Sequence, residues 1–444
     1  MSSGFAEAGA AAPPTIFPTY TVVALTLCHV AAIASSQILN ILVDPIRAAL
    51  AVSDSQFSLL QGVAFALLAA VAGIPAARVA DSGRRKQVIV AGVVGWTAGT
   101  LLCAVASTFG QLFLARVVVG LGEVFLFPAA LSLLTDVTPR PRLGAAIGIF
   151  ASGGPIGAAI ALFGGGAIIS SWPNLAELLG RGSDEGWRFC FVACVLLGMV
   201  ALAFLLHVEE PRRAERGTAD ASFGSVLRYL ARERGTFLPT IAGFLALCLS
   251  GTGLIAWAPS FAVRTLGYSF AQAGALIGTA ALVFAVAGSW SAGMAVDRLT
   301  RSGDRGAALS VSLASLAGLV AAILLADAAR PPILGAAAIF ALFFFLIVPQ
   351  ATGPIALERI TPAPMRAQML AIYLLLINLV AQAGGPSAVA LLTDHLFGAP
   401  AMVGWSMAIV CVAASAVGAL LLQGGRAAYC ALADRTDPHV MVHR

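Results

Sequence analysis

Charged residues are scarce in this chain. Asp, Glu, Lys and Arg make up only 11% of its 444 residues, whereas a soluble globular protein has about a quarter. Lysine occurs once, as Lys86. This shortage argues against a soluble globular protein, and we expect no nucleic-acid partner.

Signatures of catalysis and metal binding are also missing. The seven cysteines are scattered without metal-ligand spacing. No His-Glu-x-x-His, P-loop or Gly-x-Ser-x-Gly motif occurs, and two of the five histidines lie in the C-terminal tail. We therefore expect no enzyme, no metal site and no cofactor. An ATP-driven pump is equally disfavoured, because the sequence has no nucleotide-binding domain.

Hydrophobic residues, in contrast, are abundant. They form 59% of the chain, and the mean hydropathy is +0.92. Apolar runs recur that are long enough to cross a hydrocarbon core about 30 Å thick. We predict an all-α membrane protein with twelve transmembrane helices, at approximately residues 19–43, 56–77, 88–108, 111–134, 142–169, 187–207, 238–261, 271–296, 307–326, 333–357, 367–392 and 400–422.

The distribution of charge predicts the orientation. Residues 1–18 carry no Lys or Arg, so they lack the basic region of a cleavable signal and are predicted to be a disordered tail. Basic residues concentrate in loops on one face, notably RVADSGRRK, TPRPR, PRRAERG and DRLTRSGDRG. By the positive-inside rule this face, with both termini, is predicted to be cytoplasmic.

The chain contains two related halves. The segment LAVSDSQFSLLQG at Leu50 matches LGYSFAQAGALIG at Leu266, and at the same offset Asp81 falls on Asp297. Each half holds six predicted spans, so the repeats are parallel, an arrangement typical of transporters with a substrate site between the halves. The predicted units are a bundle at 19–207, a linker at 208–237 with an amphipathic helix in SVLRYLARER, a bundle at 238–422 and a tail at 423–444.

Two charges interrupt the fourth apolar span. Arg116 and Glu123 lie seven residues apart, which is two helical turns, so both should point the same way. A charge facing lipid costs about 2.5–3.5 kcal/mol at a helix centre, so we predict that both face the bundle interior or water and serve transport. The alternative is an ion pair that only fixes helix packing.

The first span carries a polar stripe. His29, Ser36, Asn40 and Asp44 are spaced by seven, four and four residues, which places them on one side of a helix. We predict that this stripe faces the central cavity and contributes to proton coupling or substrate binding. Two alternatives remain: Asp44 is an ordinary carboxylate at a helix end, and His29 is a hydrogen-bonded packing residue rather than a proton relay.

The second half has few charges within its spans, and its candidates for the cavity are uncharged. The run from Pro349 to Pro354 is predicted to break its helix. Asn378 and Gln382, one turn apart, are alternatively polar contacts between helices. The predicted cavity residues are Trp257, Gln350, Thr352, Tyr373, Asn378 and Gln382.

Two loops on the basic face combine acid and base at the end of a span. ARVADSGRRK contains Asp81, Arg85 and Lys86, and GMAVDRLTRSG contains Asp297 and Arg298. An acid in this position holds a neighbouring helix end in one conformation and releases it in another, which predicts a gate latch. Positive charge that only sets topology is the alternative, although it leaves the duplicated Asp unexplained.

These loops give the chain a resemblance to the major facilitator superfamily. DSGRRK and its echo GMAVDR are similar to the loop signature of that superfamily, although the first copy has Ala77 and Ser82 where Gly and Arg are usual. Within the superfamily the chain resembles the spinster-type branch and its bacterial relatives. The matching segments are Arg116-xxx-Gly120-x-Gly122-Glu123, SDSQFSLLQG, WAPSFAVRTLGYS and TPAPMRAQ.

The resemblance implies transport of lipid-like or organic-anion substrates coupled to protons. In the branch an Asp on the first span acts with the Arg and Glu of the fourth. Arg116 and Glu123 match the latter pair, but Ser35 stands where the Asp is expected. Three alternatives follow: Glu123 titrates alone, Asp44 substitutes for the missing acid, or the protein is a uniporter or exchanger.

We therefore predict a monomeric secondary transporter in the inner (plasma) membrane. It would move a small organic or lipid-like, anionic solute across the bilayer by alternating access, with a proton as a possible coupling ion. The alternatives are an efflux carrier for drug-like amphiphiles and a non-transporting membrane sensor.

Overall fold

The computed structural model describes residues 17–64, 85–180, 182, 184–209, 223–328 and 332–436, and these residues form helices and no strand. Eleven helices in these ranges are long and apolar enough to cross a membrane. The predicted second span, 56–77, begins in α3 (Asp54–Ser58) and η1 (Leu59–Val63), and its remainder lies outside the described residues. The predicted all-α membrane fold is confirmed.

The first half is a bundle of long apolar helices. Its fourth span consists of α6 and α7, which are separated at Phe125. The elements of this half, besides α3 and η1, are α1 (Phe17–Ile41), α2 (Val43–Leu50), α5 (Arg85–Val105), α6 (Phe109–Val124), α7 (Leu126–Val137), α8 (Arg140–Leu179) and α9 (Gly186–Leu206).

The second half repeats this plan after the short helix α10 (Phe223–Arg232), which matches the amphipathic helix predicted in the linker. Two of its spans contain π-helical turns, one turn in the first and two in the second. Its other elements are α11 (Arg234–Arg264), α12 (Phe270–Thr279), η2 (Ala280–Phe284), α13 (Ala285–Arg301), α14 (Ala307–Ala328), α15 (Pro332–Arg359), η3 (Ala363–Met365), α16 (Arg366–Leu376), η4 (Ile377–Gln382), α17 (Ala383–Leu391), η5 (Leu392–Phe397), η6 (Pro400–Met402) and α18 (Val403–Thr436).

The matched segments of the two halves fold identically at their start. Ser53 caps α3 and Ser269 caps α12, each accepting a hydrogen bond from the backbone N–H three residues on. The side-chain oxygens of Gln56 and Gln272 in turn accept a hydrogen bond from the backbone N–H of the capping serine. Two complete capping boxes at equivalent positions agree with the duplication read from the sequence.

Two predicted boundaries differ from the structure. The break expected between Pro349 and Pro354 is wrong, because α15 continues through both prolines. Neighbouring helices can satisfy the backbone groups that a proline leaves free inside a membrane bundle. The last helix, α18, also continues beyond the predicted end at 422 and reaches Thr436. Its extension is held against α15, because Tyr429 donates a hydrogen bond to Ala356 O and Thr436 donates one to Arg359 O.

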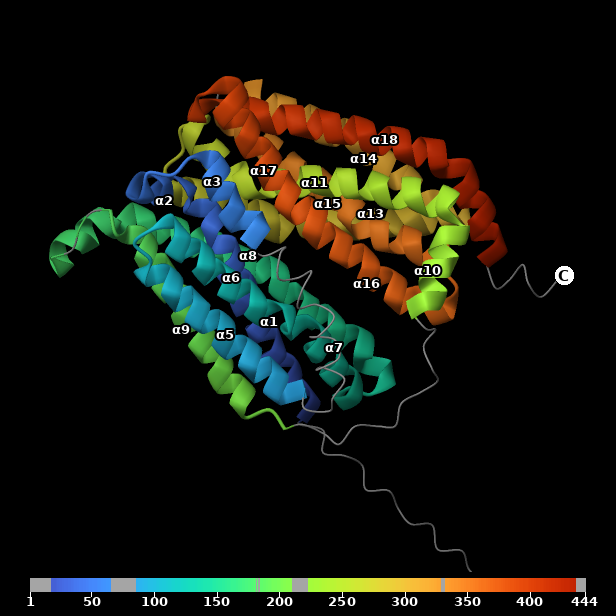
Figure 1. Cartoon of the computed structure of the whole chain (residues 1–444), viewed down its shortest axis with the longest axis horizontal. Coiled ribbons are helices and arrows are strands. Elements are labelled where there is room, and N and C mark those ends of the chain that lie inside the picture. The colour runs from blue at the N-terminus through green and yellow to red at the C-terminus, as the bar shows by residue number, and fades with distance from the viewer. Residues whose placement is uncertain are drawn as a thin grey trace, which may run out of the picture.

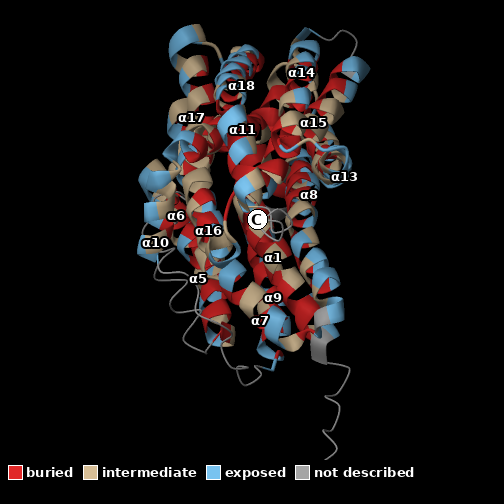
Figure 2. Cartoon of the chain, turned by 90° about the vertical axis from the view of Figure 1, so that its right-hand side faces the viewer, coloured by how far each residue is buried: buried red, intermediate tan, exposed pale blue. Residues whose placement is uncertain are grey.

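The halves meet at one end of the molecule and diverge toward the other (Figure 1). The end where they meet carries α2 and α3, and the opposite end carries the C-terminus. Contacts between the halves join α8 to α12, η1 and α3 to α17, and α1 to α11. Figure 2 shows buried residues where helices pack together and exposed residues along their outer faces. We refer below to the sealed end and the terminal end.

Candidate functional site

A cavity of about 660 Å³ lies between the two halves. Its walls are α1 and α8 of the first half and α11, α12, η2, α13 and α15 of the second. The lining is mostly apolar, and no charged side chain is among the described residues that form it. These residues are Ile33, Gln37, Asn40, Gly148, Ala151, Ser152, Gly154, Pro155, Ala158, Leu162, Ile255, Ile277, Ala281, Ala285, Val286, Ser289, Trp290, Phe343, Leu346, Ile347 and Gln350.

Three of the residues that line this cavity carry an amide: Gln37, Asn40 and Gln350. In the first half Asn40 Nδ2 donates to Gln37 Oε1 at 2.8 Å. Gln61 Nε2 donates to Asn40 Oδ1 at 3.0 Å and to Ala256 O at 3.3 Å, which ties this amide chain to α11. Gln350 lines the opposite wall, and its Nε2 is buried with no acceptor among the described residues. The cavity therefore offers hydrogen bonds within an apolar enclosure.

Arg116 and Glu123 lie in the first half, and neither is among the residues that line this cavity. Arg116 is 3% exposed, and its Nη1 donates to Ser35 O on α1 at 3.0 Å. A backbone carbonyl thus contacts the guanidinium at the position where the resemblance led us to expect an acid. Arg116 Nε and Glu123 Oε1 are buried without a partner in the described part of the chain. The two side chains form no direct ion pair there.

The four residues of the predicted polar stripe lie in four environments, and Asp44 belongs to α2 rather than α1. Asn40 lines the cavity. His29 is 2.9 Å from Phe150 O through Nδ1 and stacks on the Phe150 ring, which is the packing alternative considered above. Ser36 is half-buried and does not line the cavity. Asp44 lies at the sealed end.

An ion-pair network joins the halves at the sealed end. Arg264, at the end of α11, lies 2.7 Å from an oxygen of Asp44 and 2.7 Å from an oxygen of Asp54. Asp54 has no exposed side-chain surface, and Arg47 of its own half lies 2.9 Å away. A second contact across the halves is made by Ser55 N, which donates to Asp394 Oδ2 at 2.6 Å. Asp44 is thus part of an ion-pair network between the halves.

Glycines allow backbones to touch beside this network. A Cβ added to Gly166 of α8 would lie 2.4 Å from Phe270 O, and one added to Gly274 of α12 would lie 2.2 Å from Leu162 O. At the other contact, a Cβ on Gly62 would lie 2.2 Å from Gln382 O. These distances are too short for any side chain, so the sealed end depends on glycine at these positions.

The remaining cavity candidates of the second half are mostly packing residues. Trp257 Nε1 donates to Pro386 O at 3.0 Å, and Thr352 Oγ1 is 2.5 Å from Ser312 Oγ. Tyr373 is buried with its hydroxyl 4.0 Å from Cys248 Sγ. Asn378 and Gln382 lie half-buried on η4 and do not line the cavity. Of the six candidates, Gln350 alone is among the lining residues described.

The described residues of the predicted latch loops lie at the start of α5 and near the end of α13. Asp81 is outside the described residues. Arg85 is buried and pairs with Asp136 of α7, and Lys86 Nζ donates to Leu206 O at 2.8 Å. Asp297 and Arg298 are exposed, and their side chains form no ion pair with the described part of the chain. The latch stays a prediction.

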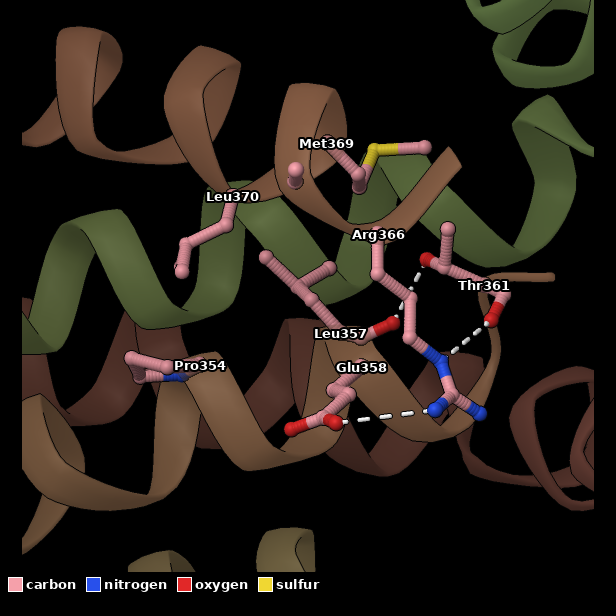
Figure 3. Close-up of a pocket in the computed structure, with 8 residues that line it drawn as sticks. Pro354, Leu357, Glu358, Thr361, Arg366, Met369 and Leu370 are labelled. Carbon is pink, nitrogen blue, oxygen red and sulfur yellow. Dashed lines mark hydrogen bonds and ion pairs between the residues drawn. The ribbon is translucent and has the colours of Figure 1, made fainter. Parts of the chain in front are cut away.

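A smaller pocket of about 260 Å³ lies beside the TPAP loop, between α15 and α16 (Figure 3). Arg366 Nε donates to Thr361 O at 3.1 Å, and Arg366 Nη1 lies 3.6 Å from Glu358 Oε1. Leu357, Met369 and Leu370 form apolar walls. The two charged side chains of this pocket, Arg366 and Glu358, are therefore paired with each other. No cluster of three metal-ligating side chains occurs among the described residues.

Sequence reasoning missed Arg264, the central residue of the sealed end. It appeared only as part of the WAPSFAVRTLGYS resemblance. A usable signal was present: Arg264 follows a predicted span on the less basic face, where Asp44 and Asp54 also fall. Charges at equivalent depth on different spans are candidates for pairing.

Comparisons with known proteins agree with this architecture. The family model of the Major Facilitator Superfamily matches residues 25–353. An MFS-type efflux pump of Mycolicibacterium smegmatis is 28% identical over 389 residues, covering 86% of each chain. A gentisate transporter of Corynebacterium glutamicum is 29% identical over 267 residues, covering 58% of this chain and 55% of the relative.

The fold is also similar to that of a solved structure. A bacterial homolog of the human lysosomal transporter Spinster, in an inward-facing and unoccupied conformation, superposes with a TM-score of 0.77 at 22% identity. The match covers 96% of this chain and 98% of that one. At this identity the likeness concerns the fold alone.

Proposed function

We propose, because this chain belongs to the Major Facilitator Superfamily, that it moves an amphiphilic organic solute across the membrane by alternating access. Members of this family are transporters rather than enzymes, and the chain is a multi-pass membrane transporter. The observation that carries the proposal is the cavity between two halves that are sealed at one end and separated at the other.

The orientation follows from the basic loops. With both termini in the cytoplasm of the inner membrane, the terminal end faces the cytoplasm, and this conformation opens inward. Asp297, which has no ion pair within the described part of the chain, is then a latch in its released state. Closing the terminal end would bring the latch loops toward neighbouring helix ends while the Arg264 network separates.

The lining favours a solute with a largely apolar body. An apolar enclosure with a few fixed polar groups is typical of small-molecule sites. This agrees with the M. smegmatis relative, an efflux pump. The gentisate transporter supports a second candidate, a small aromatic acid. For that substrate Arg116 would be the cation, although it does not line the cavity described.

Transport by reconstituted protein tests the proposal. Proteoliposomes would be assayed for uptake of gentisate, a neutral amphiphilic dye and a cationic amphiphilic dye. Ala285→Trp fills the cavity wall and should reduce transport at least about tenfold. Ala287→Trp, on the exposed side of the same helix, is the matched control and should transport normally. Failure of all three solutes, or equal effects of the two variants, would overturn the proposal.

We further propose that Glu123 carries the coupling proton. It is a membrane carboxyl with a buried oxygen that has no partner in the described part of the chain, and intramembrane acids are functional by default. Glu123→Gln should abolish stimulation of uptake by an imposed pH gradient while leaving exchange at equal pH. Glu177→Gln, at an exposed acid of the same half, serves as the control. Full stimulation in Glu123→Gln would exclude this role.

A further inference from the structure

A separate cavity of about 360 Å³ lies in the first half, as a cleft between α8 and α9 with α1 as its floor. Both walls are membrane-spanning helices. Helix α9 packs on α1, α5 and α8 and lies on the side away from the second half (Figure 1). Ile160, Leu196 and Val200 at the mouth of the cleft are exposed. The mouth therefore faces the hydrocarbon of the bilayer.

The cleft reaches the interior of the bundle. Ala34 and Ile38 of α1 form its floor, and they are only 1% and 2% exposed. On the same helix Ile33 and Gln37 line the central cavity instead. The two cavities share no described lining residue, so α1 separates the cleft from the proposed transport route.

Gly164 of α8 shows that the cleft has room for an occupant. A Cβ added there would meet no atom within 4 Å, whereas one added to the adjacent Gly165 would lie 2.7 Å from Ile38. Along α8 the lining runs from Ile160 to Ile168, which is about 12 Å. An apolar cavity of about 150 Å³ is enough to bind benzene, and the cleft has more than twice that volume.

The lining determines what can fill this space. Every described lining residue is Ala, Gly, Cys, Ile, Leu or Val, so no side-chain nitrogen or oxygen of the described lining can hold water. The thiols of Cys190 and Cys194 donate to Gly165 O and Ala34 O within the bundle. Apolar cavities stay dry, and an empty cleft would leave its lining without dispersion contacts. The occupant should therefore be apolar.

A membrane supplies two apolar occupants, a lipid chain and a helix of a second copy. A helix with its side chains is about 10–12 Å wide. The walls are too close for that, because Cys190 Sγ of α9 lies 3.9 Å from Gly165 O of α8. We infer that the cleft binds one acyl chain of a bilayer phospholipid, which completes the packing of the first half. This inference does not depend on which solute the protein carries.

Photo-cross-linking tests the inference on the full chain, in nanodiscs of phosphatidylethanolamine and phosphatidylglycerol. A small share of the phospholipid carries a diazirine near the end of one acyl chain, and tandem mass spectrometry locates the adducts. Adducts are expected on Ala34 and Ile38, which are reached through the cleft. Adducts on Ile33 in their place would put the chain in the central cavity. Adducts confined to exposed residues such as Leu196 would mean that lipid covers the mouth without entering, and either result overturns the inference.

Gly164→Leu places a side chain in the open space and should lower the adducts on Ala34 at least about tenfold. Gly144→Leu is the matched control, because an added Cβ at this position of the same helix also meets no atom within 4 Å and the residue does not line the cleft. Ala193→Phe fills the cleft from α9 and should cause the same loss. A ligand of the folded state raises its stability, so added phospholipid should raise the melting temperature of detergent-purified Gly164→Leu less than that of Gly144→Leu.

Three results with these variants would overturn the inference. The first is an unchanged level of Ala34 adducts in both Gly164→Leu and Ala193→Phe, and the second is equal stabilisation of the two glycine variants by lipid. The third is a disulfide-linked dimer formed in high yield by Leu196→Cys, which would assign the cleft to a second copy. If the filled variants fail to fold, the adducts of the wild type decide. The transport proposal is unaffected by any of these outcomes.

Discussion

The two ends of the molecule use their charges differently. At the sealed end Arg264 of the second half pairs with Asp44 and Asp54 of the first. At the terminal end the described ion pairs stay within one half, as with Arg85 and Asp136, or Arg305 and Asp434. Pairing across the halves favours one conformation of the transporter. Pairing within a half is compatible with both the inward-open and the outward-open conformation.

This contrast predicts which substitutions change the balance between conformations. Removing a contact that crosses the halves should favour opening of the sealed end. Removing a contact within a half should lower stability without a preference for either conformation. The predictions below test this difference, beginning with the largest expected effect.

Arg264→Gln should have the largest effect. Asp54 has no exposed side-chain surface and, among the described residues, would keep only Arg47 as a counter-ion. Loss of one partner from a buried pair costs several kcal/mol, and with Arg47 remaining we expect about 2 kcal/mol. The sealed end should open, so a cysteine placed at Ser55 should react faster with a membrane-impermeant maleimide.

Arg305→Gln is the matched control for that experiment. It removes an arginine of the same half whose partner, Asp434, is half exposed, and such pairs contribute at most about 1 kcal/mol. Labelling at position 55 should stay at the wild-type rate. Equal labelling of the two variants would mean that the contacts across the halves do not control the sealed end.

Gly166→Ala should have an intermediate effect. The new Cβ meets Phe270 O at 2.4 Å, so α8 and α12 must separate, at a cost of about 1–3 kcal/mol to the sealed conformation. Gly164→Ala, one half-turn away on the same helix, meets no atom within 4 Å and is the control. Cross-linking between cysteines on α8 and α12 should fall in Gly166→Ala only. A similar loss in both variants would argue against close backbone contact.

Asp304→Asn should have the smallest effect. Burial raises the pKa of this carboxyl, but the hydrogen bonds from Ser310 and Gly306 and the ion pair with Arg426 outweigh it, so the pKa lies below the ordinary 3.8. The wild type is therefore stabilised above that pH and loses the contribution as the pH falls through the lowered pKa. We expect a loss of less than about 1 kcal/mol at neutral pH.

Thermal melts at neutral and strongly acidic pH check this prediction. The difference between Asp304→Asn and the wild type should shrink at the acidic pH, because Asp304 is then protonated in both folded and unfolded chains. Cysteine labelling at the sealed end should be unaffected. Faster labelling would show that this cluster also acts on the conformational balance.

The sequence was a good guide wherever local patterns determine structure. Apolar runs predicted the spans, and the matched segments at Leu50 and Leu266 correspond to two capping boxes. Helix α15 was mispredicted because the sequence shows only that Pro349 and Pro354 disfavour a helix locally. The packing of the surrounding helices, which allows α15 to continue, cannot be read from that local preference. The π-helical turn η4 likewise has no simple sequence signature.

The site was harder to predict because its contacts join distant segments. Periodicity placed Asn40 and Asp44 on one face, yet one lines the cavity and the other pairs with Arg264 across the halves. Hydropathy singled out Gln350 as a polar residue in an apolar span. It gave no information about Gly251, whose missing side chain makes room for the amide.

Arg47 has a further consequence for the conformational cycle. When the halves part, Asp54 loses the guanidinium of the opposite half but retains that of Arg47, 2.9 Å away on its own side. Water can hydrate Arg264 as it leaves, so the carboxylate of Asp54 keeps a counter-ion throughout the change. Because Arg47 remains beside Asp54, the electrostatic barrier to outward opening is lower. The transporter can therefore change conformation quickly although strong ion pairs hold its sealed end closed.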